Sequence, residues 1–300
     1  MTSEAGAVTA DPGRVELRPR NVVHDWSTTP LHWIADDPIA SHAIGALNFL
    51  LPEGERMFCA TFLELAPQIT DERLRREVLG FVGQESMHAE THEEVLHGVY
   101  GAHGIDPAPL IAQARFLFRR VVGPRTGASP RRAAQHLLDR AALIGGLEHL
   151  FAYLGDWILN ADLESHGADP EMLDLFRWHG AEEVEHRHVA HDLVLYLQVG
   201  YVRRNLAMVV GVGALLALIL RNTRHLVRAD PDLPDLGYPG IARALVGSMR
   251  RGTFPHIPRL LASAAGCLHP RYSPAAVGDT AQALAYLAVS PSARRGAEPR

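Results

Sequence analysis

The stretch WHGAEEVEHRHVAHD, residues 178–192, contains four histidines and four acidic residues. On an α-helix, residues that are three, four and seven positions apart lie on one face. His179, Glu183 and His186 have this spacing, so we expect them to form one inward-facing stripe. The stretch therefore predicts a helix that presents two imidazoles and one carboxylate to the protein interior.

Four long helices are predicted, and the last one contains this stretch. It begins at Asp169 and Pro170, because an Asp side chain caps the first turn and a proline needs no N–H at the first helical position. Pro52 marks the start of the first helix for the same reason. No stretch alternates with the period of a β-strand, so we expect an all-α fold. The predicted long helices span residues 52–68, 70–104, 131–160 and 169–201.

The other three helices also carry glutamates on their inward stripes. The second contains the pair Glu85-x-x-His88, while Glu55 in the first and Glu148 in the third interrupt apolar stripes. Burying a lone carboxylate is costly unless it is paired or binds a metal. A glutamate from each of two helices and a Glu-x-x-His pair from each of the other two is the arrangement of di-iron and di-manganese carboxylate bundles. The predicted metal ligands are Glu55, Glu85, His88, Glu148, His179, Glu183 and His186.

The ligand order resembles that of ferritin-like di-iron carboxylate proteins. With the additional histidine His179, it is similar to the seven-ligand pattern of p-aminobenzoate N-oxygenase-type di-iron oxygenases. The motifs LPEGERMF, GQESMH and HGAEEVEHRHVAHD are similar to those of the bacterial family labelled predicted metal-dependent hydrolases. Gln84 stands where the N-oxygenase type tends to carry an acid, so we expect the surroundings of the ligands to differ. The resemblance covers about residues 20 to 200.

This resemblance implies a ferritin-like four-helix bundle with additional N-terminal and C-terminal helices. It implies that Glu85 and Glu183 bridge two metal ions, that Glu55 and Glu148 are terminal ligands, and that the histidines supply nitrogen ligands. The expected cofactor is a pair of iron ions, with manganese as the alternative. The implied function is a non-haem oxygenase or oxidase that activates dioxygen to oxidise a small, apolar or amine-bearing substrate, with electrons from an unidentified donor.

Two other functions stay open at the level of sequence. A dinuclear metal site can act as a Lewis acid for hydrolysis, which the family label favours. A non-enzymatic metal-binding protein of the ferritin-like type is the third possibility. The C-terminal hundred residues favour a substrate lid or a dimer surface over a ferritin-like cage, so we expect a homodimer.

The remaining sequence predicts three regions: a flexible segment at residues 1–20, the metal-binding bundle at 21–200, and a helical extension packed on the bundle at 201–300. Residues 206–220 carry no polar side chain, but they are fewer than the roughly 20 residues that span a bilayer, so burial is favoured over membrane contact. The net charge of −5 and scattered basic residues argue against nucleic acid as a partner. The two cysteines fit a reducing cytoplasm.

Several polar residues near the predicted ligands have simpler interpretations. We expect Glu53 to be a solvated acid in the first turn of its helix. Of Glu182 and Glu185, we expect one to face solvent and the other to form a salt bridge. His92 either orients a metal ligand or makes an ordinary polar contact, and Cys59 is expected to be a small buried residue.

Overall fold

The fold is helical throughout the residues that the structure, a computed structural model, describes, which are 13–298. Within that range the backbone forms no β-strand, and the one β-bridge joins Ile34 and Ala168. The predicted all-α class is therefore confirmed.

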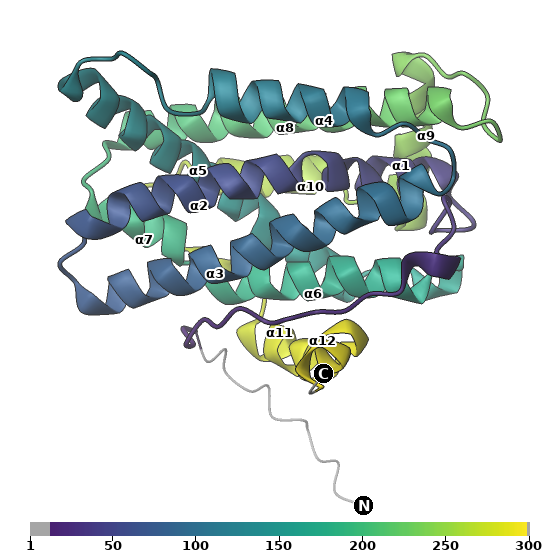
Figure 1. The fold of residues 1–300 in the computed structure, drawn as a ribbon, viewed down its shortest axis with the longest axis horizontal. Coiled ribbons are helices and arrows are strands. Elements are labelled where there is room, and N and C mark those ends of the chain that lie inside the picture. The colour runs from purple at the N-terminus through teal and green to yellow at the C-terminus, as the bar shows by residue number, and fades with distance from the viewer. Residues whose placement is uncertain (1–12, 299–300) are drawn as a thin grey trace, which may run out of the picture.

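Four long helices lie side by side in the centre of the molecule (Figure 1). They are α2 (Leu51–Leu65), α3 (Glu72–Val95), α5 (Pro130–Asn160) and α6 (Pro170–His186). Helix α2 contacts α3 and α5, and α6 contacts the same two helices, so the four surround a common axis. Every side chain on the inner stripe of one helix therefore faces the inner stripes of the others.

The predicted last long helix is divided in the structure. Helix α6 ends at His186, and α7 (Val189–Tyr196) begins after a two-residue turn. At the turn, the Arg187 guanidinium donates to the carbonyl oxygens of Val184 and, at 3.3 Å, of Pro274. These side-chain contacts lie at the turn between α6 and α7 and supply a donor to the Val184 carbonyl near the end of α6.

Side-chain caps set the starts of two central helices. The Asp169 carboxylate accepts the Met172 N–H at 2.9 Å, ahead of Pro170, as the sequence predicts for α6. Helix α3 is capped by Asp71, which accepts from Leu74 N–H at 2.9 Å. The hydroxyl of Thr70, the residue before Asp71, forms a hydrogen bond with the hydroxyl of Tyr196 at 2.8 Å.

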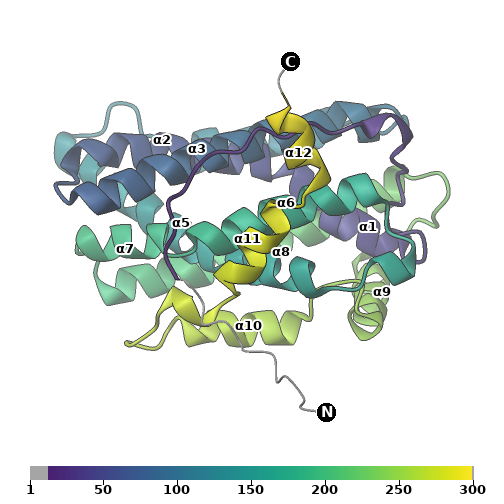
Figure 2. The ribbon, with the colours of Figure 1, turned by 90° about the horizontal axis from the view of Figure 1, so that it is seen from below.

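The other elements surround this centre. Helices α11 and α12 cross the outer face of α6 (Figure 2). The described segment before α1 runs along α3 and α6 (Figure 1). Residues 1–20 are predicted to be flexible, and residues 1–12 of this region lie outside the described residues. The other α-helices, besides the four central ones and α7, are α1 (Pro38–Gly45), α4 (Ala108–Arg115), α8 (Tyr201–Ala229), α9 (Tyr238–Arg251), α10 (Ile257–Gly266), α11 (Thr280–Leu287) and α12 (Pro291–Ala297). Short 3-10 or π-helical turns are Trp26–Thr28, Ala46–Phe49, Ala66–Gln68, Leu96–Gly101, Phe116–Val121, Glu164–His166 and Pro274–Ala276.

Helix α8 contains the apolar segment 206–220. The helix packs mainly on α5, with Met208, Val212 and Leu215 buried. Its opposite face is open, since Val202 is 77% and Leu206 62% exposed. By length and hydropathy α8 could cross a membrane, although buried core helices pass the same test. The structure thus buries one face of the segment, and the preference for burial over membrane contact stays a prediction.

Candidate metal centre

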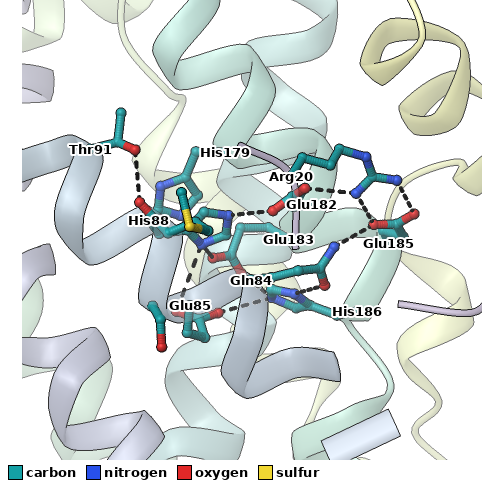
Figure 3. Close-up of polar contacts among 12 residues, drawn as sticks. Arg20, Gln84, Glu85, His88, Thr91, His179, Glu182, Glu183, Glu185 and His186 are labelled. Carbon is teal, nitrogen blue, oxygen red and sulfur yellow. Dashed lines mark hydrogen bonds and ion pairs between the residues drawn. The ribbon is translucent and has the colours of Figure 1, made fainter. Parts of the chain in front are cut away.

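Seven buried side chains converge between the four central helices, and Figure 3 shows five of them, Glu85, His88, His179, Glu183 and His186. Helix α2 contributes Glu55, α3 contributes Glu85 and His88, α5 contributes Glu148, and α6 supplies the rest. Their donor atoms fall into overlapping groups in which all atoms lie within 4.8 Å of one another. The structure thereby brings together the whole predicted set, Glu55, Glu85, His88, Glu148, His179, Glu183 and His186, and metal binding by these residues stays a prediction.

Glu85 and Glu183 lie between two halves of this centre, one that contains His186 and one that contains His88 and His179. Glu183 Oε1 lies 2.8 Å from His179 Nε2, whereas its Oε2 lies 3.2 Å from His186 Nε2. Glu85 Oε1 lies 3.2 Å from His186 Nε2, whereas its Oε2 lies 3.8 Å from His88 Nδ1. Each carboxylate therefore directs one oxygen to each half, which is the placement that two bridging ligands need.

The two halves differ in their terminal donors. Glu148 Oε2 lies 3.3 Å from His186 Nε2, in the half that His186 supplies with nitrogen. Glu55 Oε1 lies 3.8 Å from His179 Nε2, in the half that contains two histidines. Each half thus contains one further glutamate and at least one imidazole, and the terminal and bridging roles that the resemblance implies stay predictions.

The donor atoms fit metal ions because the protein does not satisfy them otherwise. Both carboxylate oxygens of Glu55, Glu85 and Glu148, together with His88 Nδ1, are buried without a hydrogen-bond partner among the described residues. Leaving so many buried polar atoms unsatisfied is costly. Two divalent cations would balance the charges of the four carboxylates, and a set of oxygen and imidazole donors suits iron and manganese.

The electrostatics of the centre also favour a cation. Burial and the neighbouring carboxylates raise the pKa of Glu55 and Glu148 well above the usual value, and burial with Glu183 raises the pKa of Glu85 to about 8. Burial alone would raise the pKa of Glu183 as well, but His186 and His179 lower it overall. Without metal, the centre therefore retains protons that a bound cation would displace.

Arg20, in the segment before α1, supports the centre from outside (Figure 3). Its guanidinium bonds Glu182 Oε1 at 2.7 Å and Glu185 at 2.8 Å. The other oxygen of Glu182 lies 3.0 Å from His88 Nε2. If His88 donates its Nε2–H to this carboxylate, the lone pair of its Nδ1 faces Glu85, which fixes the tautomer for metal binding.

A parallel chain of contacts reaches His186 through Gln84. The Gln84 amide donates to Glu185 Oε2 at 2.6 Å, and its carbonyl oxygen lies 3.1 Å from His186 Nδ1. An amide can donate to the glutamate and accept from the imidazole at the same time, whereas an acid at this position would repel Glu185. This explains the glutamine that departs from the N-oxygenase pattern.

One of Glu182 and Glu185 is expected from the sequence to face solvent and the other to form a salt bridge. The salt bridge is present, but the solvent-facing position is wrong, because both residues are buried, at 0% and 3% exposure, and both pair with Arg20. The expectation for Glu53 is wrong as well. Its carboxylate is 5% exposed and bonds Arg119 at 2.7 Å and Arg115 at 3.2 Å. In each case an arginine from a distant part of the chain covers the acid, and no local spacing indicates such a partner.

His92 belongs to the centre although the sequence leaves its role open. Its Nε2 lies 2.6 Å from His179 Nδ1, and its Nδ1 lies 2.6 Å from Asn48 Oδ1. The amide of Asn48 donates to the Gly45 carbonyl at 3.2 Å, which orients the Asn48 oxygen toward His92. With Asn48 as the acceptor, His92 donates its Nδ1–H to Asn48 and can accept from His179 Nδ1, while His179 Nε2 is directed at Glu183 Oε1, 2.8 Å away.

Cys59 lies one helical turn from Glu55 but outside the donor groups. Its thiol lies 3.5 Å from the Val82 carbonyl and from the Ser86 hydroxyl. Burial raises the pKa of the thiol to about 12, so it stays protonated at neutral pH. The thiol therefore makes polar contacts between α2 and α3, as expected for a small buried residue.

An apolar cavity of about 70 Å³ opens against one side of the centre. His179 and Glu183 are the ionisable residues in its wall, and the remainder is aliphatic, aromatic or glycine. Leu216 and Ile219 of α8, Phe254, and Leu260 of α10 come from the C-terminal third of the chain. The C-terminal region therefore forms part of the wall beside the metal centre, which no motif in its sequence indicates.

A helical protein with a buried cluster of glutamates and histidines belongs to the class of metal-dependent helical proteins. The sequence model of the family described as "predicted metal-dependent hydrolase" matches residues 18–278, and the chain belongs to this family. The match extends well past residue 200, where the sequence motifs end. No curated protein and no solved structure matches the chain. The likeness to ferritin-like proteins and to the N-oxygenase type therefore stays a prediction.

Proposed function

We propose that the protein is a non-haem di-iron enzyme that uses dioxygen to oxidise a small apolar substrate. The observation that carries the proposal is the apolar cavity whose wall includes His179 and Glu183. Two iron ions, when bound, would supply the capacity to activate dioxygen. A substrate in the cavity would lie directly beside two of their proposed ligands.

The protein residues have separable tasks in this proposal. Glu85 and Glu183 would bridge the two ions, Glu55 and Glu148 would be terminal ligands, and His88, His179 and His186 would supply nitrogen. Glu182, Gln84 and His92 would orient the three imidazoles through contacts of 3.0, 3.1 and 2.6 Å. Leu150, Phe151 and the other apolar wall residues exclude water from the substrate.

The lining of the cavity favours oxidation over hydrolysis. Hydrolysis of an ester, amide or phosphate benefits from donors that stabilise the developing oxyanion. Apart from His179 and Glu183, the described residues that line this cavity carry no charged side chain and no hydroxyl, carboxamide or guanidinium group, and Trp157 contributes a single indole N–H. Oxidation of a hydrocarbon or aryl group needs no such donors from the protein.

The second candidate is a dinuclear metal-dependent hydrolase, which the description of the family favours. In that case the two ions would act as Lewis acids, and the same seven residues would hold them. The choice between the two functions depends on whether turnover requires dioxygen and a redox-active metal.

The decisive experiment compares metals and atmospheres on one protein preparation. The chelated protein is loaded anaerobically with ferrous iron, and we expect about two irons per chain, the number that the two halves of the centre would hold. Admission of oxygen should produce oxygen consumption and a transient absorption change. In a matched pair of variants, Glu148→Gln should abolish the response and Glu90→Gln, on the exposed face of α3, should retain it. Indifference of the iron-loaded protein to oxygen, with zinc-dependent hydrolysis under nitrogen, would establish the hydrolase instead.

A further inference from the structure

A second group of metal-binding side chains lies outside the seven-residue centre. His32 precedes α1, His42 lies within α1, and Asp230 follows the last residue of α8. The Nε2 atoms of His32 and His42 lie 2.6 and 2.7 Å from the same oxygen, Asp230 Oδ2. The other oxygen of Asp230 accepts the Asp232 N–H at 2.9 Å, which turns Oδ2 toward the two imidazoles.

Among the described residues, no lysine or arginine forms an ion pair with Asp230. The side chains of Asp230 and His42 have no solvent exposure, and among the described residues the ion-pair partners of Asp230 are the two histidines. A buried carboxylate without a cation is costly, so the site favours a positive ion.

The donor geometry is suited to one metal ion. The three donor atoms lie within 4.8 Å of one another, and both imidazole nitrogens lie 2.6–2.7 Å from Asp230 Oδ2, so small side-chain shifts would bring all three to bonds of about 2.0–2.2 Å around one ion. Two imidazoles and one carboxylate form a common protein ligand set for zinc, which leaves a fourth position for water. His32 keeps 24% of its side chain exposed, so solvent can reach this position.

We propose that His32, His42 and Asp230 form a separate mononuclear site for zinc or a similar divalent cation, with water as the fourth ligand. The ion would tie together the segment before α1, α1 itself and the end of α8. Two of its three donors are imidazoles, whereas four of the seven donors in the central cluster are carboxylates. The mononuclear site should therefore prefer zinc more strongly than the central cluster does.

The test counts metal in full-length variants that separate the two sites. The chelated wild-type protein, saturated with zinc and freed of excess, should retain about three zinc ions per chain, two in the central cluster and one at the new site. His32→Asn and Asp230→Asn should each lose one ion, whereas Glu148→Gln should lose zinc from the central cluster and keep the new site. His225→Asn, in α8 but outside the donor group, is the matched control and should retain all three.

Cobalt provides a second readout. A four-coordinate mononuclear Co²⁺ site gives intense visible absorption, which should disappear in His32→Asn and persist in Glu148→Gln. Circular dichroism identifies any variant that does not fold, and the partly exposed His32 is the safer position. Equal metal content in wild-type and folded His32→Asn protein would overturn the proposal. Loss of the central cluster alone would count against the proposed function and not against this site.

Discussion

His92 Nε2 lies 2.6 Å from His179 Nδ1, so one buried imidazole orients another whose Nε2 faces Glu183 at 2.8 Å. Burial and the neighbouring histidines lower the pKa of His92 well below its usual value, so His92 is neutral and its Nε2 can accept a proton from His179. The predicted ligand that distinguishes the seven-residue set, His179, thus contacts on its far side a residue that is not part of the predicted set.

Replacement of His92 by phenylalanine should weaken metal binding without unfolding the protein. The aromatic ring fills the space, but His179 loses the acceptor that fixes its tautomer. Loss of such a partner typically reduces metal affinity by about 10–100-fold. Competition with a chromophoric chelator measures the change, and His97→Gln, at an exposed position, is the control. Unchanged affinity in His92→Phe would show that His179 does not need this partner.

Arg20→Gln should destabilise the protein, because it leaves the buried carboxylates of Glu182 and Glu185 without a cation. The pairs lie at 2.7 and 2.8 Å, and the Arg20 side chain is 25% exposed, so solvent screens part of the effect. We expect a loss of about 2 kcal/mol in the free energy of unfolding, below the range for fully buried pairs. Urea denaturation measures it, with Arg18→Gln, at a 73% exposed side chain, as a neutral reference.

Metal affinity should rise with pH between about 6 and 8. The pKa of Glu85 is raised to about 8 and that of His186 is also raised, so both hold protons at neutral pH in the metal-free protein. Because a cation binds their deprotonated forms, protons compete with the metal and are released when it binds. Calorimetric titration with Mn²⁺ in buffers of different ionisation enthalpy measures the release. Affinity that is independent of pH would contradict this assignment.

The same pKa shift affects the stability of the metal-free protein. Folding raises the pKa of the Glu85 carboxyl above the value of about 4.3 that it has in the unfolded chain. The contribution of such a group to stability is complete at a pH below the unfolded-state pKa, and it is lost as the pH rises through the folded-state pKa. For Glu85 that loss extends to about pH 8. We expect the Tm of metal-free protein to fall from pH 6 to pH 8, and metal saturation to reduce this fall. Scanning calorimetry with and without Mn²⁺ tests both parts.

Gly155→Ala should disturb the contact between α5 and α6. A Cβ atom at Gly155 meets the backbone carbonyl of Gly180, and one at Gly180 would lie 2.8 Å from the Gly155 Cα. Forcing a methyl group into such a contact costs about 1–3 kcal/mol. Gly213→Ala is the matched control, because open space surrounds Gly213 and the change should stabilise α8 by about 0.5–1 kcal/mol. Thermal unfolding compares the two, and equal Tm values would show that the helices can separate without cost.

The sequence by itself determined which side chains share a helix face. His179, Glu183 and His186 repeat at helical spacing, and the caps at Asp169 and Pro170 are local, so both follow from the geometry of a single helix. The same logic placed Glu55, Glu85, His88 and Glu148 on inward stripes, and four such helices that surround one axis bring their stripes together. For this reason the all-α class and the convergence of the seven residues could both be predicted.

Only the tertiary structure decided the surroundings of that cluster. Glu53, Glu182 and Glu185 are buried because arginines from distant segments cover them, and helical periodicity contains no information about such partners. The orientation of His179 by His92 and the cavity wall from α8 and α10 likewise depend on how separate helices pack. Periodicity is a property of one segment, whereas burial and pairing are properties of the contacts between segments.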